Sequence, residues 1–202
     1  MVILFFMNTI PPFDHVGGHP LIDFVNTKMT PGGQLVDQLA RNGDVVAWMV
    51  DVGMIEEGTV LFSVSDAQDL LDEVRAFRQQ MRDMLAAIVA EQPVAEETIG
   101  VINAQLVHWK ATPQLIKTDN VYKRPFAYKL TGSAQLLALL TYTAAQFVTD
   151  VDFRYVKQCD KSTCIRYFLD TSRNHSRRWC SMEGCGNRNK ANKHYARKKR
   201  GG

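Results

Sequence analysis

The chain has 202 residues, of which 46% are hydrophobic, enough for one sizeable core or for a domain of about 150 residues with a small appendage. Its net charge of +3 conceals an asymmetry: residues 151–202 carry 14 Lys and Arg against 4 Asp and Glu, whereas residues 1–150 carry 10 against 17. These balances of +10 and −7 predict two units with different partners, 1–150 and 151–202, the second suited to phosphates. No apolar run approaches the roughly 18 residues of a membrane span, so we expect a cytoplasmic protein without membrane contact.

Helices are expected through most of the first unit. The segment Pro20–Thr27 is consistent with a short helix or extended stretch, and Asp44 is a candidate cap for a second helix. Ser65 and Gln68 match a capping box before a long helix over about residues 66–90. Apolar residues recur along that helix at a spacing of three or four, namely Leu70, Val74, Phe77, Met81, Leu85 and Ile88.

The period of the sequence changes after the next predicted helix, which follows Pro93. Residues 114–130 alternate apolar and polar side chains around Asp119-Asn120, which predicts a β-hairpin that Pro125 restricts to an edge. Ser133 is then expected to cap the apolar helix AQLLALLTYTAAQFV, the central element of the core. The predicted fold class is α+β, with a mainly helical N-terminal domain that carries a small hairpin.

The cysteines are confined to the last quarter of the chain, in two pairs, Cys159-x4-Cys164 and Cys180-x4-Cys185. Two close pairs can converge on one tetrahedral zinc ion, and four thiolates leave no coordination position for water. We therefore predict one structural zinc ion per chain, whose removal unfolds residues 155–200 and leaves the helical domain folded. Two disulfides are the alternative, which needs an exported chain. His175 and His194 are weaker candidates as ligands.

The order of elements around the cysteines is that of a treble-clef-like zinc finger. After the first pair, Tyr167 and Leu169 alternate on one predicted strand, Ser172–His175 forms a turn, and Trp179 lies on the returning strand. A helix from about Gly184 then places Cys185 in its first turn, where the helix dipole favours a thiolate.

The stretch LDTSRNHSRRWCSMEGCGNRNKANKH resembles the CGNR zinc finger of bacterial proteins, whose name is Cys185-Gly186-Asn187-Arg188 in this chain. The resemblance covers roughly Tyr155 to Arg200. The motif His19–Thr27, HPLIDFVNT, is similar to the opening of the ABATE domain that precedes such fingers. Proteins with both parts are described as stress-induced transcription regulators. The resemblance therefore implies zinc, double-stranded DNA and regulation of transcription.

Basic side chains near the second cysteine pair are the candidate DNA contacts. Lys190, Lys193, Arg197 and Arg200 form one helical stripe for phosphates, and Asn187 and Arg188 are residue types that read base edges. The full set of candidates is Arg177, Arg178, Asn187, Arg188, Lys190, Lys193, Arg197 and Lys198. The alternatives are a solvated tail, a surface that pairs with the acidic first unit, or an RNA- or protein-interaction module.

The first unit offers weaker functional signals. His15, His19 and Asp23 are spaced four apart, but Gly17, Gly18 and Pro20 interrupt a regular helix, so a metal site there is not expected. Asp23, Asn26 and Thr27 either line a pocket for a small-molecule effector or tie down the opening loop. We also predict a homodimer, formed through an apolar face of the helical domain that its own core leaves uncovered. No nucleophile elbow, P-loop or GxGxxG motif is present, so we expect no enzyme.

Overall fold

The structure is a computed structural model that describes residues 13–187 except 124, 125 and 129. Its α-helices are α1 (Pro20–Asn26), α2 (Asn42–Asp51), α3 (Leu70–Val89), α4 (Glu96–Leu106) and α5 (Ser133–Asp150). Short antiparallel strand pairs connect them, so the predicted α+β fold with a mainly helical N-terminal part is confirmed. No helix in the described part of the chain is long and apolar enough to cross a membrane.

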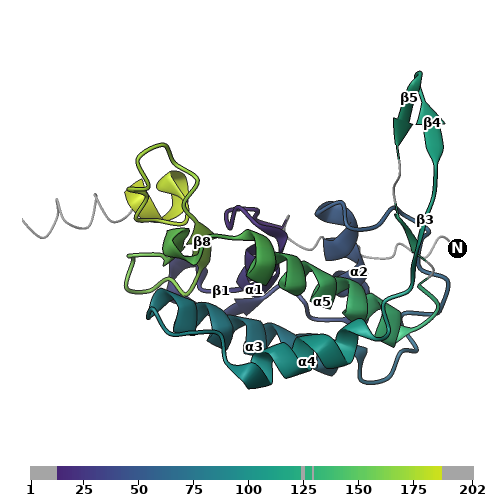
Figure 1. The fold of residues 1–202 in the computed structure, drawn as a ribbon. Coiled ribbons are helices and arrows are strands. Elements are labelled where there is room, and N and C mark those ends of the chain that lie inside the picture. The colour runs from purple at the N-terminus through teal and green to yellow at the C-terminus, as the bar shows by residue number, and fades with distance from the viewer. Residues whose placement is uncertain (1–12, 124–125, 129, 188–202) are drawn as a thin grey trace, which may run out of the picture.

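α3 and α5 supply the centre of the core. All the apolar residues that predicted α3 are buried, because their spacing places them on one face of the helix. α5 buries Leu136, Leu137, Leu140 and Phe147, as expected for the central element. α1 and α2 pack on α3, and α4 runs beside α5 (Figure 1).

The starts of three helices differ from the sequence prediction. α3 begins at Leu70 and not at residue 66, because Asp69 adopts a left-handed conformation with φ of 64°. The Ser65 hydroxyl lies 3.1 Å from the Asp66 carboxylate and does not cap a helix. Asp44 is the third residue of α2, where its carboxylate accepts the amides of Ala40 and Arg41 at 2.9 Å. Ser133 is the first residue of α5 and not its cap.

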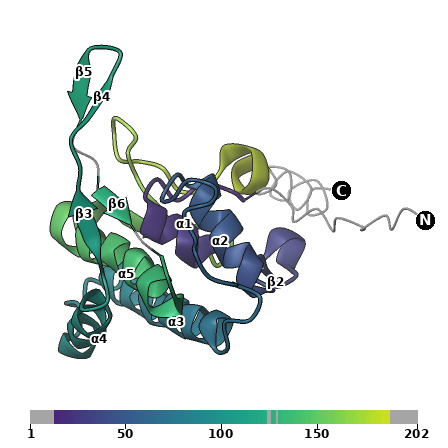
Figure 2. The ribbon, with the colours of Figure 1, turned by 90° about the vertical axis from the view of Figure 1, so that its right-hand side faces the viewer.

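The predicted hairpin is confirmed. β4 (Ile116–Thr118) pairs with β5 (Val121–Lys123), and Asp119 and Asn120 both have positive φ, as a two-residue type I′ turn requires. β3 (Ala111–Pro113) pairs with β6 (Phe126–Tyr128) in a separate two-stranded sheet, and β1 (Lys28–Met29) pairs with β2 (Val36–Asp37) in another. Figures 1 and 2 show the β4–β5 ribbon projecting from the helical body. Pro125 lies outside the described residues.

The C-terminal unit contains a different hairpin from the predicted one. A 3₁₀ turn, Phe153–Tyr155, leads into β7 (Val156–Gln158), which pairs with β8 (Tyr167–Leu169). The prediction that β8 pairs with the segment around Trp179 is therefore wrong. The first cysteine pair forms the connection between β7 and β8, so closing that turn brings the two strands into register. The turn at Ser172–His175 is confirmed by a 3.0 Å hydrogen bond from the His175 amide to the Ser172 carbonyl.

The two units share one hydrophobic core. Val156 of β7 and Tyr167 of β8 are buried in the same cluster as the helices, and β7 packs on α3 while β8 packs on α1. Phe168 faces the opposite way and is fully buried among the four cysteines. α5 ends at Asp150, and the 3₁₀ turn that leads into β7 begins at Phe153.

Candidate metal centre

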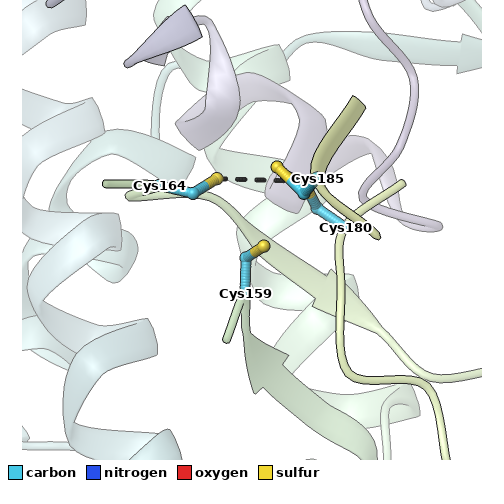
Figure 3. A group of neighbouring side chains, drawn as sticks. All are labelled: Cys159, Cys164, Cys180 and Cys185. Carbon is cyan, nitrogen blue, oxygen red and sulfur yellow. Dashed lines mark hydrogen bonds between the residues drawn. The ribbon is translucent and has the colours of Figure 1, made fainter. Parts of the chain in front are cut away.

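The four cysteine side chains point toward one another (Figure 3). Their sulfur atoms all lie within 4.8 Å of one another, and no other group of three or more potential ligands is found in the described part of the chain. All four cysteines are free, so the disulfide alternative is not realised in the structure. His175 is not among the ligands, because its Nδ1 lies 2.9 Å from the Asp170 carbonyl and its ring stacks on Tyr155.

The distances between the sulfur atoms fit tetrahedral zinc. A Zn–S bond of about 2.3 Å implies a sulfur–sulfur edge of about 3.8 Å in a regular tetrahedron. The Sγ atoms of Cys164 and Cys180 are 3.9 Å apart, and those of Cys180 and Cys185 are 3.6 Å apart. A disulfide would need about 2.05 Å. The cluster therefore has the size of a zinc site with four thiolate ligands.

Local hydrogen bonds hold each cysteine pair in a tight turn. In the first pair the Cys164 amide donates to the Lys161 carbonyl at 2.8 Å, and the Cys159 amide donates to the Arg166 carbonyl at 3.0 Å. In the second pair Ser181 caps the helical turn Met182–Gly186, and its hydroxyl accepts the Gly184 amide at 2.9 Å. This turn carries Cys185, as predicted for the start of the helix.

The cysteine thiols shift one another's pKa. Thiol groups of Cys164 and Cys180 donate to the Cys159 sulfur, and this lowers the pKa of Cys159 well below its usual range. The same contact raises the pKa of Cys164 to about 11 and raises the pKa of Cys180 further. A divalent cation must therefore displace protons from the cluster, so its binding is pH-dependent.

Two family models match this sequence. The ABATE model, whose description reads "Putative stress-induced transcription regulator", matches residues 18–151. The chain belongs to the ABATE family. The CGNR zinc finger model matches residues 155–198, which include all four cysteines, so the cluster is the structural site of one zinc ion. A comparison with curated proteins finds no match.

The opening motif of the ABATE domain holds the CGNR finger in place. The Asn26 amide group donates to the Tyr167 carbonyl at 2.8 Å and accepts the Tyr167 amide at 3.0 Å, so it pairs with β8 as a strand would. The Asp23 carboxylate accepts the Gly17 amide at 2.7 Å, and the Gly17 carbonyl accepts the Leu169 amide at 2.7 Å. The Thr27 hydroxyl is also bonded, because it accepts from the buried Arg78 at 2.7 Å.

These contacts correct the expectation of an effector pocket beside Asp23, Asn26 and Thr27. The three side chains are buried, with exposed fractions of 8%, 3% and 2%, and they bond to groups of the protein itself. Their role is therefore structural, the alternative that the sequence left open. His19 likewise caps α1 by accepting the Leu21 amide, and His15 pairs with Asp51 at 2.6 Å.

Arg177 is not an exposed DNA contact. Its guanidinium donates to the carbonyls of Trp179, Val16 and Cys180 and lies 4.4 Å from the centre of the Phe168 ring. It therefore ties the second cysteine pair to the segment that precedes α1. Arg178 remains on the surface, 61% exposed, in an ion pair of 2.5 Å with Asp160.

The other predicted DNA contacts are placed only in part. Asn187 is exposed immediately after the helical turn that carries Cys185. Arg188, Lys190, Lys193, Arg197 and Lys198 lie outside the described residues.

Asp170 is a site residue that sequence reasoning missed. Its side chain is 1% exposed and accepts from the Lys157 ammonium at 2.6 Å, the Arg177 amide at 2.9 Å and the Ser172 hydroxyl. Burial alone would raise the pKa of Asp170, but these donors lower it well below its usual range. A single carboxylate thus organises the loop between the cysteine pairs. No spacing signal marks it, because its partners come from three separate segments.

Proposed function

We propose that this protein is a zinc-dependent transcription regulator that binds double-stranded DNA through its CGNR finger. The carrying observation is the charge balance of +10 in residues 151–202, set on a zinc-stapled unit beside a domain with a balance of −7. Lys and Arg that neutralise phosphates supply most of the affinity of such proteins for DNA. Exposed Arg178 and Asn187 belong to this unit, which also contains the basic segment that begins at Arg188.

In this proposal zinc has a structural role and the protein acts by binding and not by catalysis. Four thiolates complete the tetrahedron of the metal, so no position is left for a substrate or a water molecule. Cys159, Cys164, Cys180 and Cys185 would hold the ion, and the ion would fix the direction in which the chain leaves Cys185. The ABATE domain then supplies a support, because the Asn26 side chain joins it to the finger at Tyr167.

The aromatic residues support DNA over RNA as the partner. A protein that binds single-stranded RNA usually offers exposed aromatic rings for stacking on bases. Here Tyr167 and Phe168 are buried, with exposed fractions of 4% and 0%, and Trp179 is half-buried under Arg178. These rings pack inside the finger and against the helices, so they are not available for stacking on bases.

The test is the affinity of the full, zinc-loaded chain for mixed-sequence duplex DNA as a function of salt. If about five phosphates are neutralised, log K should fall with log salt with a slope of roughly −4 to −5. Lys193→Ala should reduce the magnitude of that slope by about one unit, whereas Lys28→Ala in the ABATE domain serves as the matched control. Zinc content is measured for each protein, so that loss of the finger is separated from loss of a contact.

Sequencing the DNA fragments that the protein retains from a random pool then tests for a preferred site. No salt-dependent affinity for duplex DNA at low salt would refute the proposal. Preference for single-stranded RNA in a competition assay would favour the interaction-module alternative.

A further inference from the structure

The β4–β5 ribbon carries apolar side chains that its own chain leaves uncovered. Leu115, Val121 and Tyr122 are 75%, 55% and 66% exposed. An isolated two-stranded hairpin is at best marginally stable in water, because it has no third layer on which to bury a face. Figures 1 and 2 show the ribbon standing clear of the helices. A covering partner would explain why this sequence keeps apolar residues there.

The ribbon also has the opposite charge from the domain that bears it. Residues 110–130 contain five Lys and Arg and one acidic residue, whereas the rest of residues 1–150 contains five Lys and Arg against 16 Asp and Glu. In the ladder Lys123 lies opposite Ile116, and Lys117 lies opposite Tyr122. Each exposed lysine therefore sits beside an apolar side chain, and the ribbon presents both kinds of contact together.

A surface hollow of about 480 Å³ has the complementary chemistry. Its apolar lining comes from α2 and the segment that follows Gly58, and includes Val46, Ala47, Val50 and Val60. Glu56 and Glu57 lie at the same hollow, are exposed, and make no ion pair within the described part of the chain. Asp51 adds a third carboxylate, which is paired with His15.

The hollow and the base of the ribbon are neighbours on one chain. Val60 forms a bridge with Leu130, and the Leu61 amide donates to the Leu130 carbonyl at 2.8 Å. Leu130 follows β6, the strand through which the ribbon returns to the body. When an arm and its receiving surface are adjacent, two copies related by a two-fold axis can exchange arms and satisfy both contacts at once.

We propose that the β4–β5 ribbon is a dimerisation arm, which docks in the hollow beside α2 of a second copy of this chain. Tyr122 covers the apolar lining of the hollow, and Lys117, which lies opposite Tyr122 on the same face of the ribbon, meets Glu56 and Glu57. Duplex DNA is a poorer occupant, because Asp119 lies at the tip of the ribbon and phosphates would leave the apolar side chains exposed. The proposal does not depend on the finger or on DNA binding.

The test uses charge reversal in the full, zinc-loaded protein, with the mass in solution measured by sedimentation equilibrium. The wild type should be a dimer in the micromolar range. The arm variant Lys117→Glu, and the hollow variant Glu56→Lys with Glu57→Lys, should each raise the dimer dissociation constant roughly tenfold or more, because like charges then face each other. Mixing the two variants should restore the dimer, since both contacts of the mixed pair again join opposite charges.

Matched controls separate this result from misfolding. Glu96→Lys with Glu97→Lys, on exposed residues of α4, changes the net charge as the hollow variant does and should leave the dimer unchanged. Circular dichroism and zinc content should match the wild type in every variant. A monomeric wild type overturns the proposal. So does a dimer dissociation constant that neither charge reversal changes, or one that stays raised when the two variants are mixed. Loss of DNA affinity in the arm variant without a change in mass would assign the ribbon to DNA instead.

Discussion

Asp23 is a buried carboxylic acid whose burial lowers the stability of the folded state by an amount that depends on pH. Burial raises the pKa of Asp23 to about 6, although the Gly17 amide donates to it. The folded state therefore binds more protons than the unfolded state between about pH 4 and pH 6, and stability falls as the pH rises through that window. At neutral pH the ionised side chain costs up to about 3 kcal/mol.

We predict that Asp23→Asn becomes more stable relative to the wild type as the pH rises from 5 to 8. The asparagine oxygen can still accept the Gly17 amide, but it has no charge to bury. The measurement is the difference in unfolding free energy between the two proteins at each pH, with zinc in excess. A difference that is constant across this range would contradict the prediction.

Asp170 shows the opposite arrangement, a buried carboxylate with a full set of donors. Replacement by Asn leaves the Lys157 ammonium without its ion-pair partner and removes one acceptor from the loop. We predict that Asp170→Asn destabilises the finger by about 2 kcal/mol, less than the roughly 3–5 kcal/mol of a fully buried pair because Lys157 is partly exposed. Competition with a chromophoric chelator should show weaker zinc retention, with Asp160→Asn as the control on the exposed pair with Arg178. Equal retention in both variants would argue against this role.

At the scale of elements, the side chain that caps the start of α2 belongs to a residue inside the helix. Asp44 is 2% exposed and its carboxylate accepts the amides of Ala40 and Arg41, two donors that the helix itself cannot satisfy. Asp44→Ala should lower the free energy of unfolding by about 1–2 kcal/mol. Asp66→Ala, in the turn before α3, should cost little because Asp66 caps no helix. Chemical denaturation of both variants measures the contrast, and equal losses would refute it.

At the scale of the whole molecule, the shared core revises what zinc removal should do. The sequence predicted that a chelator would unfold the finger and leave the helical domain intact. Val156 and Tyr167, however, belong to the core of the helices, so loss of the finger also removes contacts from α1 and α3. We predict that chelation unfolds the finger and lowers the melting temperature of the helical part by roughly 2–4 °C for each kcal/mol lost.

Hydrogen exchange followed during chelation measures this coupling. Amides of β7 and β8 should lose protection completely, while those of α3 and α5 should keep partial protection. Adding zinc back should restore both. Unchanged exchange in α3 would mean that the two units are independent, as the sequence alone suggested.

The sequence by itself determined the elements whose cause is local. Cysteine spacing predicted the metal ligands, apolar spacing predicted α3 and α5, and Asp119-Asn120 predicted the turn of the ribbon, because each pattern acts over a few neighbouring residues. The starts of α2 and α3 differed from the prediction, because Asp69 adopts a positive φ and Asp44 accepts the amides of Ala40 and Arg41 from the third position of its helix.

Only the tertiary structure decided what the polar residues of the two motifs do. Asn26 bonds to Tyr167 across 141 residues, and Arg177 bonds to Val16 across 161. No local pattern encodes such a partner, so an apparent pocket residue and an apparent DNA contact both became supports for the finger. The tertiary structure also decided that β8 pairs with β7. The apolar alternation of β8 is short enough to match several segments of the sequence. Closure of the turn that carries Cys159 and Cys164 selects β7 as the partner.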